Sequence, residues 1–366
     1  MPSNSGMTLA QFETLLNATD DDFEPNKLAM TLNHKKYEVT NIILPQYKKL
    51  RTGTSYTSHI QLEDATNGAH TGMFFVQDQV NLYETDQTIE SSYRHYINSC
   101  SYDEAQLDIN SGDRAKRYDY IKSQRMAMYR KIGDDLKEKF WSAPSSATDT
   151  TNPIGPFGWL VLGTNNSTGD FSGGDPYYLD GNTYSAGGKA TGTYTKWKNF
   201  YADHNGDLGE ALLELMGTCN RKTDFELPIV PNARQQVDGI VTNGSSKLVY
   251  YTSDNVIKNV EKIARNSDDR IGYDLGKYAG ETTYKGIPFR YNDIFDTAST
   301  YLYGTDPVVA INWNIMYPVV VKNWYFRSKV ANHPFAHNCF NEFVDLYWCG
   351  VHCENRQMTG WLISQQ

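Results

Sequence analysis

Residues 111–143 read SGDRAKRYDYIKSQRMAMYRKIGDDLKEKFWSA and contain the clearest helix pattern in the chain. The apolar side chains that recur at helical spacing are Tyr118, Ile121, Met128, Ile132, Leu136 and Phe140, with no proline between them. A helix from Asp113 to Phe140 would be about 40 Å long, and Ser111 and Pro144 are suitable start and stop residues. Because its other face is strongly charged, we predict a long amphipathic helix packed on one core.

The N-terminal stretch is typical of an arm. Residues 1–49 carry one short helix pattern, in which Thr8 is a candidate N-cap and Leu9, Phe12 and Leu16 share a face. The remainder has no sustained period and too little apolar surface to fold alone. We therefore expect the arm to lie on something else.

Residues 50–87 predict a two-stranded β-ribbon. An alternating stretch at 55–63 and a strand-like stretch at 73–84 flank Asn67-Gly68, a pair that supplies the positive φ angles of tight hairpin turns. The outer part of the ribbon is polar on both faces, and two strands alone are marginal in water. We expect this ribbon to be either disordered or pressed against a neighbour.

The rest of the chain predicts a mixed region, so the fold class is α+β. Helices are predicted at 208–219 and 253–267, and strands at 247–252, 306–321, 341–353 and 357–364. Ser253 is the expected N-cap of the second helix. Residues 151–200 contain ten glycines and predict loops and short strands. The stretch YKGIPFRYNDIFD (284–296) predicts a strand that bends at Gly286 and Pro288.

Composition restricts the classes of function. The net charge of −9 argues against a protein that coats nucleic acid, although a wall could enclose nucleic acid without gripping it. No apolar run approaches the roughly 18–20 residues that span a bilayer. The five cysteines are an odd number and no secretory signal is visible, so free thiols in a reducing compartment are expected. The 26 tyrosines fit extensive self-contact as well as a tyrosine-rich core.

Two loops invite comparison with ligand-binding motifs, and neither fits. GNTYSAGGKA (181–190) lacks the spacing of a phosphate-binding loop, and Ala190 stands where that loop has a hydroxyl. DHNGDLGEALLE (203–214) has oxygen ligands at calcium-loop spacing, but Leu208 occupies the position that requires glycine. Neither loop therefore predicts a cofactor.

The densest group of potential metal ligands lies near the C-terminus and comprises His333, His337, Cys339, Cys349, His352 and Cys353. If 343–353 is a strand, Cys349 and Cys353 share a face about 13 Å apart, too far for one metal ion or a disulfide. Only a turn at Gly350 would bring them together. With no nucleophile motif either, we expect no catalytic residue, no cofactor and no metal.

The order of these parts resembles the major capsid proteins of tailed bacteriophages, which have the Hong Kong 97-like fold. The segments that carry the resemblance are 111–143, 278–296, 306–321 and 341–364, and the ordered set covers essentially the whole chain. The resemblance implies an N-terminal arm (1–49), an extended β-hairpin loop (50–87), a peripheral domain with a spine helix (88–145), an axial domain (146–335) and return strands of the peripheral domain (336–366).

This resemblance also implies function and partners. Subunits would form hexamers and pentamers of an icosahedral-type shell that encloses phage double-stranded DNA without sequence-specific binding and without a membrane. Assembly in the host cytoplasm would place the protein in the virion. Because the ribbon starts near residue 50, no room is left for an N-terminal scaffolding extension, so a separate scaffolding protein is implied. A portal protein and decoration proteins are further partners of such shells.

The same resemblance points to surfaces rather than an active site. The candidates for contacts between subunits are Asp64, Asn67, Gly68 and His70 in the ribbon tip, and Arg290, Tyr291 and Asn292 after the bent strand. One alternative within the same fold is an encapsulin-like compartment shell that holds an enzyme cargo. An alternative of another class is a carbohydrate-binding or carbohydrate-cleaving protein, suggested by Trp, Tyr and Asn in the glycine-rich region.

Overall fold

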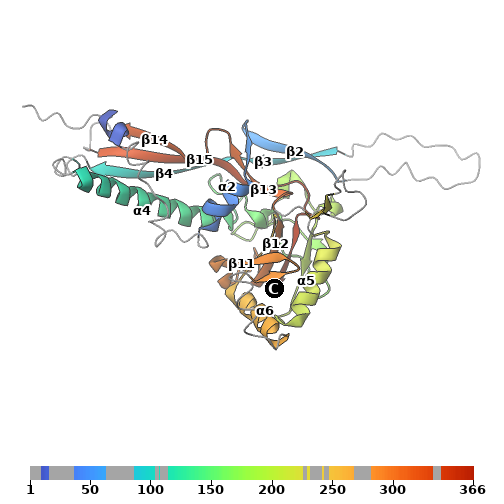
Figure 1. The fold of residues 1–366 in the computed structure, drawn as a ribbon. Helices are drawn as coiled ribbons and strands as arrows, with labels where there is room; N and C mark the ends of the chain where they lie inside the picture. Colours follow the sequence, from blue (N-terminus) through green and yellow to red (C-terminus); the bar gives the residue numbers. More distant parts are fainter. Residues whose placement is uncertain are drawn as a thin grey trace, which may run out of the picture. The chain divides into compact units, whose positions relative to one another are not determined.

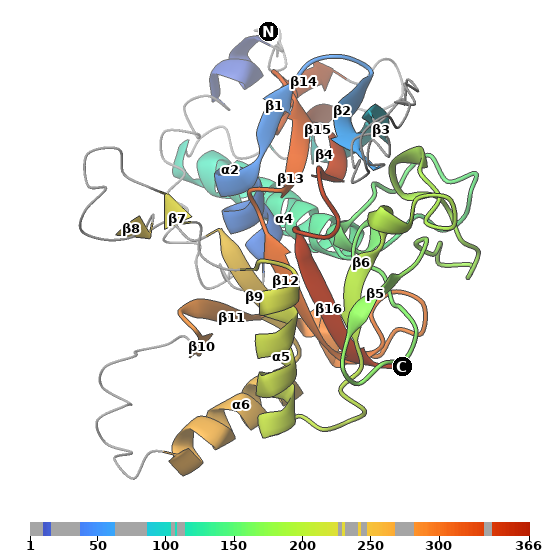
Figure 2. The same cartoon turned by 90° about the vertical axis from the view of Figure 1, so that its right-hand side faces the viewer.

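The structure is a computed structural model that describes residues 10–15, 37–62, 86–103, 107, 114–225, 229–230, 241–242, 247–267, 282–332 and 339–366. The chain folds into two compact units (Figures 1 and 2). The first unit comprises Met1–Thr54, Tyr93–Phe140 and Pro318–Gly350, and the second comprises Ser55–Ser92, Trp141–Tyr317 and Val351–Gln366. No helix in the described ranges is long and apolar enough to cross a membrane.

A sheet and a long helix form the first unit. Its elements are η1 (Val39–Ile43), α2 (Leu44–Tyr47), β1 (Lys49–Arg51), β4 (Arg94–Asp103), α4 (Arg114–Phe140), β14 (Arg327–Asn332) and most of β13 (Met316–Val321) and β15 (Cys339–Cys353). The first two residues of β13 and the last three of β15 belong to the second unit. The strand order is β1-β13-β15-β14, and β4 also pairs with β15. α4 lies along β4, where the Asn98 side chain donates to the Met128 carbonyl (3.4 Å).

The long helix is confirmed. α4 begins one residue after the predicted start and ends at Phe140 as predicted. The described part of its apolar stripe is buried, namely Ile121, Met128, Ile132, Leu136 and Phe140. One side chain corrects the expectation of a charged opposite face, because Arg125 lies on the stripe and is only 3% exposed. Ser111 and the side chain of Tyr118 lie outside the described residues.

Two described parts of the predicted arm pack on the first unit. In the helix at 10–15, the Phe12 ring is fully buried and stacks on Phe340, with 4.6 Å between ring centroids. Further along, Tyr37 lies against α4, and a Cβ at Gly133 would come within 2.5 Å of its ring. Glycine at position 133 therefore permits this close approach. The described arm residues gain their burial from the unit beneath them, as expected for an arm.

The second unit is built on a seven-stranded sheet. Its order is β10-β11-β9-β12-β16-β6-β5. The strands are β5 (Asp170–Gly173), β6 (Asn199–Ala202), β9 (Leu248–Thr252), β10 (Thr283–Tyr284), β11 (Ile287–Tyr291), β12 (Thr305–Asn312) and β16 (Gly360–Gln365). Helices α5 (Glu210–Lys222) and α6 (Asp254–Ser267) lie beside this sheet (Figure 2). Alternate sheet residues and the apolar sides of both helices form one core cluster.

Both predicted helices and the buried strand at 247–252 are therefore present. Ser253 directly precedes α6 and its carbonyl accepts the Ile257 N–H (3.3 Å), as expected of the N-cap residue, while its hydroxyl donates to Asp306 Oδ1 (2.8 Å). The domain boundaries differ from the prediction. Residues 318–335 belong to the first unit, and 351–366 belong to the second, because β16 lies between β12 and β6.

The stretch 284–296 also differs from its prediction. It forms a hairpin in which Lys285 (φ 50°) and Gly286 (φ 79°) make the two-residue turn between β10 and β11. Two consecutive positive φ angles are what such a turn requires, which favours glycine at its second position. Pro288 lies within β11, opposite Thr283, and the bend expected there is replaced by the turn.

The described part of the ribbon is its base. β2 (Ser55–Gln61) pairs antiparallel with β3 (Asp86–Ser92), with Ser55 opposite Ser92 and Gln61 opposite Asp86. The predicted strand stretch at 73–84 lies outside the described residues. A second small pair joins β7 (Ile229–Val230) and β8 (Val241–Thr242).

Candidate functional site

The predicted contact residues fall into two groups. Asp64, Asn67, Gly68 and His70 of the ribbon tip lie outside the described residues. Arg290, Tyr291 and Asn292 lie at the end of β11 and in the turn that follows it. The candidate surfaces that the structure describes are therefore that turn and the base of the ribbon.

Tyr291 is held at the surface by a neighbouring carboxylate. Its side chain is 45% exposed, and its hydroxyl donates to Asp296 Oδ2 at 2.5 Å. The other oxygen of Asp296 accepts the backbone N–H of Asp254, the first residue of α6 (3.0 Å). The hydrogen bond to Asp296 raises the pKa of Tyr291, so its hydroxyl remains a donor at neutral pH. The ring thus presents an exposed apolar face in a defined orientation.

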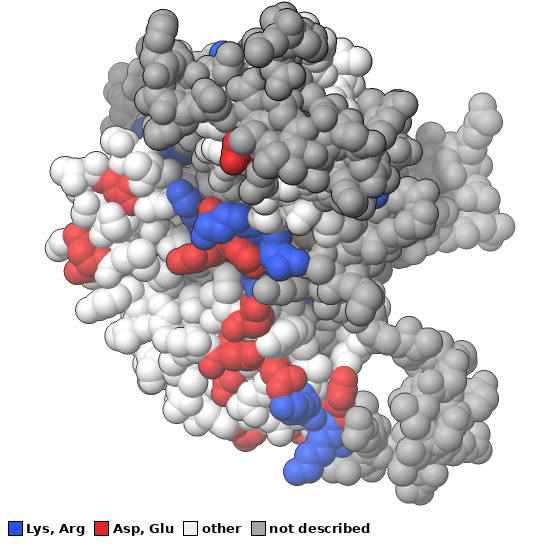
Figure 3. Space-filling view, turned by 90° about the vertical axis from the view of Figure 1, so that its left-hand side faces the viewer, with Lys and Arg blue, Asp and Glu red and all other residues white. Residues whose placement is uncertain are grey.

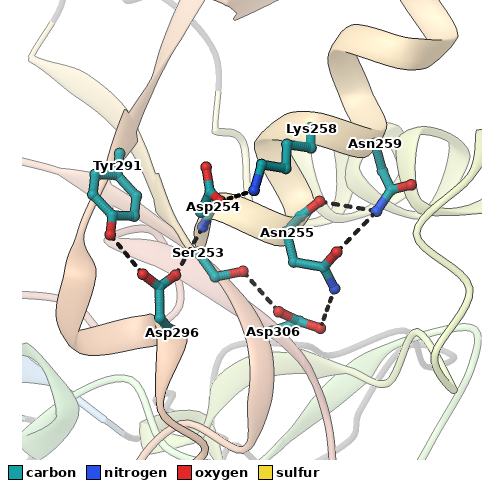
Figure 4. A network of polar contacts seen from close by, with 8 residues as sticks. All are labelled: Ser253, Asp254, Asn255, Lys258, Asn259, Tyr291, Asp296 and Asp306. Carbon is teal, nitrogen blue, oxygen red and sulfur yellow. Dashed lines mark hydrogen bonds and ion pairs between the residues drawn. The ribbon is translucent and has the colours of Figure 1, made fainter.

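A polar network around the start of α6 connects this turn to β12 (Figure 4). Asp306 on β12 accepts from Ser253 Oγ (2.8 Å) and from Asn255 Nδ2 (2.7 Å). Asn259 in turn donates to Asn255, and Lys258 pairs with Asp254. Acceptors at the first turn of a helix satisfy its free N–H groups and complement the helix dipole. The network therefore fixes the surface on which Tyr291 lies.

The two neighbours of Tyr291 offer less surface. Asn292 is 5% exposed, and its Oδ1 accepts the Ile294 N–H (3.2 Å), capping the short helix η6 (Asp293–Asp296). Arg290 is half-buried in β11. Of the three predicted residues, Tyr291 exposes a large side chain, whereas Asn292 acts within the subunit.

An exposed apolar patch in the second unit was missed by sequence reasoning. Leu179 and Tyr301 are both 46% exposed, and the Tyr301 ring lies 6.1 Å from the Tyr177 ring. The same ring covers Gly181, where a Cβ would be 3.1 Å from it. The sequence spacing of these residues shows no periodicity, because the patch is formed by two turns that are far apart in the sequence. Only the frequency of Tyr beside Gly in these turns hinted at it.

His352 anchors both strands of the ribbon base. Its imidazole is fully buried, with Nε2 at 2.8 Å from Ser58 Oγ on β2 and Nδ1 at 2.8 Å from Ser91 Oγ on β3. The Tyr56 ring meets it edge-on, with 4.6 Å between centroids. A hydroxyl can donate or accept, so both ring nitrogens are satisfied in either tautomer. This contact explains how a short polar strand pair is held at its base.

A buried ion pair fastens the spine helix to its sheet. Arg125 on α4 donates from Nη2 to Glu342 Oε1 (2.8 Å) and from Nε to Oε2 (3.0 Å). Glu342 on β15 is fully buried and also accepts from Tyr102 on β4 and Ser328 on β14. One carboxylate thus joins four elements of the first unit. The helical spacing from Ile121 to Arg125 was the available signal that this arginine faces inward.

The potential metal ligands are not assembled into a site among the residues that the structure describes, where no group of three or more His, Cys, Asp or Glu could hold an ion. β15 continues through Gly350, as the strand prediction for this stretch requires. Burial raises the pKa values of Cys349 and Cys353 to about 12, so both are neutral thiols near pH 7. His333 and His337 lie outside the described residues.

Charge on the described surface is mixed. On the face drawn in Figure 3, Lys and Arg side chains lie beside Asp and Glu side chains. Two exposed pairs of this kind are Lys131 with Asp135 on α4 and Lys258 with Asp254 on α6. Nucleic-acid grooves instead cluster Lys and Arg on one surface.

Comparisons with known proteins found similar chains among the solved structures. No family model and no curated protein matches the sequence. A chain of the capsid asymmetric unit of cyanophage A-1(L) matches with a TM-score of 0.55 and 12% identity, over 87% of this chain and 90% of that one. The capsid of a native GTA particle matches with a TM-score of 0.47 and 10% identity, over 87% and 88% of the two chains. The capsid of the Myoviridae phage XM1 also has a TM-score of 0.47, with 9% identity over 88% and 91%. The chain shares the α+β fold of the cyanophage A-1(L) capsid protein.

Proposed function

We propose that this chain is a major capsid protein that assembles through hexamers and pentamers into an icosahedral-type shell around phage double-stranded DNA. The observation that carries the proposal is the fold shared with the cyanophage A-1(L) capsid protein, because that likeness covers 87% of this chain and 90% of the other. A likeness over nearly all of both chains leaves little of either chain for a separate catalytic domain. The proposal places function in surfaces that meet other subunits.

We assign the parts of a Hong Kong 97-like subunit as follows. The first unit, with α4 and the β15 sheet, is the peripheral part, and the described residues of the arm pack on it. The second unit, with the seven-stranded sheet, is the axial part, and β16 belongs to it. The β2–β3 pair is the base of the extended loop. This assignment replaces the boundaries expected from the sequence where the two differ.

The proposed subunit contacts follow from exposure. In a ring, one surface of a subunit meets a different surface of the next subunit. We assign Tyr291 and the patch of Tyr177, Leu179 and Tyr301 to such contacts, because Tyr291, Leu179 and Tyr301 expose large apolar side chains and a hydrogen bond to Asp296 holds Tyr291 in place. The ribbon tip would reach a neighbouring subunit, adding contact area that the two units cannot provide.

Further partners belong to the same proposal. A separate scaffolding protein would guide assembly in the host cytoplasm, a portal protein would occupy one vertex, and decoration proteins would bind the finished virion. The net charge of −9 suits a wall that encloses DNA without binding it tightly.

Electron microscopy of the protein expressed with and without a scaffolding protein tests the proposal. We expect closed shells with hexameric faces, and nuclease-protected DNA in particles from infected cells. Shells that hold a protein cargo and no DNA would identify an encapsulin-like compartment instead. A protein that remains monomeric with every candidate scaffold, and that binds glycans, would contradict the proposal.

A further inference from the structure

Arg356 is a fully buried cation whose bonded partners are all neutral. It follows β15 in the second unit, and its side chain is inaccessible to solvent. Nε donates to the Trp159 carbonyl at 2.7 Å, and Nη2 donates to the Gly174 carbonyl and to Asn199 Oδ1, both at 2.9 Å. A buried charge is costly unless an opposite charge and hydrogen bonds compensate it. Here the hydrogen bonds are present and a bonded counter-charge is missing from the described contacts.

Two donors near this arginine have no partner among the described protein atoms. The first is Nη1 of Arg356 itself, which is buried and takes no part in the hydrogen bonds above. The second is the buried hydroxyl of Tyr184. The Tyr184 oxygen lies 3.0 Å from the position that a Cβ would take at Gly158. Gly158 precedes Trp159, whose carbonyl binds Arg356. The Arg356 guanidinium, through Nε, and the Tyr184 hydroxyl therefore both lie beside residues 158–159, and the two groups interact electrostatically.

The electrostatics of the pair agree with this geometry. Burial lowers the pKa of Arg356 to about 10, which still leaves the guanidinium charged at neutral pH, and the nearby Asp175 carboxylate partly opposes that effect. Oδ1 of Asp175 accepts the Thr191 N–H (2.9 Å). Burial raises the pKa of Tyr184, so its hydroxyl keeps its proton. Buried unpaired polar groups of native proteins generally bind water or an ion.

We propose that Arg356 Nη1 and the Tyr184 hydroxyl bind a small monovalent anion of the halide class, such as chloride. A guanidinium nitrogen can only donate, and a phenol hydroxyl can donate, so both can point at one acceptor. Water would provide an acceptor but no charge, whereas a halide provides both, and charge-assisted hydrogen bonds are the stronger kind. The ion would join β15, the segment around Trp159 and the Tyr184 turn within the second unit. This site is independent of the proposed shell function.

Thermal unfolding in matched salts tests the proposal. The purified protein is melted in sodium chloride and in sodium gluconate at equal ionic strength, over a series of concentrations. A ligand that binds only the folded state raises Tm by mass action, and we expect a rise of about 2 °C once chloride reaches about ten times its Kd. Tyr184→Phe should abolish the difference between the two salts.

Tyr201→Phe is the matched control, because the Tyr201 hydroxyl is also buried but donates to the Ser364 carbonyl (3.2 Å). The absolute Tm of this variant is not the readout. Its difference in Tm between chloride and gluconate should equal that of the natural protein. In crystals grown in bromide, anomalous scattering should peak between Arg356 Nη1 and the Tyr184 oxygen. Equal melting in both salts, together with density at this point that is free of anomalous signal, would identify a water molecule and overturn the proposal.

Discussion

At the scale of single residues, the first unit depends on one buried charge pair. Glu342 receives hydrogen bonds from Arg125, Tyr102 and Ser328, so all four elements around it depend on the same carboxylate. Burial raises the pKa of Tyr102, which stays protonated and donates. A buried pair contributes little net stability compared with apolar residues, but breaking it leaves an isolated charge in the interior.

Glu342→Gln should therefore destabilise the protein strongly. The substitution keeps the side-chain shape but leaves Arg125 without its counter-charge, and we expect a loss of about 3–5 kcal/mol in the free energy of unfolding. Chemical denaturation of the unassembled subunit measures it. Lys131→Ala, which breaks an exposed pair on the same helix, is the control and should change stability little. Equal effects of the two substitutions would contradict the role of the buried pair.

The buried thiols predict a decline of stability at alkaline pH. The pKa values of Cys349 and Cys353 are about 12 in the folded protein, against about 8.5 for a free thiol in the unfolded chain. Groups whose folded pKa is raised contribute stability fully below the unfolded pKa and lose it as pH rises toward the folded value. Ionisation of each thiol should lower the free energy of unfolding by roughly 3 kcal/mol between pH 7.5 and 10.5.

Denaturation at several pH values checks this decline. The variant with Cys349→Ala and Cys353→Ala is the reference, because it retains the titrating tyrosines but lacks both thiols. Its stability should fall less steeply above pH 8.5, and it should still assemble and contain no stoichiometric zinc. Identical slopes for the two proteins would show that the thiols ionise freely.

At the scale of elements, the structure explains why a polar strand pair holds its place. β2 and β3 pair through seven residues on each strand and bury few side chains of their own. Ile89 of β3 is an exception, because it is fully buried and lies against Gly187. Polar contacts add to this attachment: His352 bonds Ser58 and Ser91, and Lys189 donates to Gln87 Oε1 on β3 (2.8 Å). This clamp fixes the base of the ribbon.

His352→Phe should loosen the ribbon base locally. Phenylalanine keeps an aromatic ring beside Tyr56 but removes both hydrogen bonds and leaves the Ser91 hydroxyl buried without them, which costs about 1–3 kcal/mol. Amide hydrogen exchange should become faster in 55–61 and 86–92 and stay unchanged in β9. His59→Phe changes an exposed histidine on the same ribbon and should leave exchange unaffected. Unchanged protection in both strands of the His352 variant would refute the clamp.

At the scale of the whole molecule, the proposed function depends on contacts between subunits. Neither unit exposes a single dominant apolar surface among the described residues; the exposed large side chains are Leu50, Ile97, Leu179, Tyr291, Tyr301 and Met358. Stable interfaces bury on the order of 1,200–2,000 Å². Arms and ribbons that cross to neighbours would provide area that such scattered residues cannot.

Shortening the ribbon tip should separate folding from assembly. Replacing 64–72 by Asn-Gly removes no residue of the described core, so melting of the free subunit should change little. Ordering a polar loop costs roughly 1–2 kcal/mol per residue, which contacts with a neighbour must offset. We therefore expect capsomers or fragile shells by electron microscopy, and tip cleavage by protease in free subunits but not in particles. Shells of normal stability from the shortened protein would contradict the extended-loop assignment.

Local patterns were sufficient for the elements whose residues interact with near neighbours in the chain. The 3.6-residue period placed α4 within one residue and identified its buried stripe, and a short run of β-formers identified β9. The same period also indicated that Arg125 faces inward, but its charge favoured the opposite interpretation. In 284–296, the pattern located the strand but not the hairpin turn at Lys285-Gly286, because turn and bend share the same glycine signal.

What the sequence determined by itself was therefore the order of helices, strands and the ribbon, and from that order the resemblance to a capsid protein. Only the tertiary structure decided which partners meet: Glu342 with Arg125, 217 residues away, His352 with the two ribbon strands, and β16 between β12 and β6. The reason is physical. Periodicity reflects contacts between residues three or four apart in a helix, or alternate residues in a strand, whereas a buried polar partner is selected by three-dimensional packing and leaves no periodic trace in the chain.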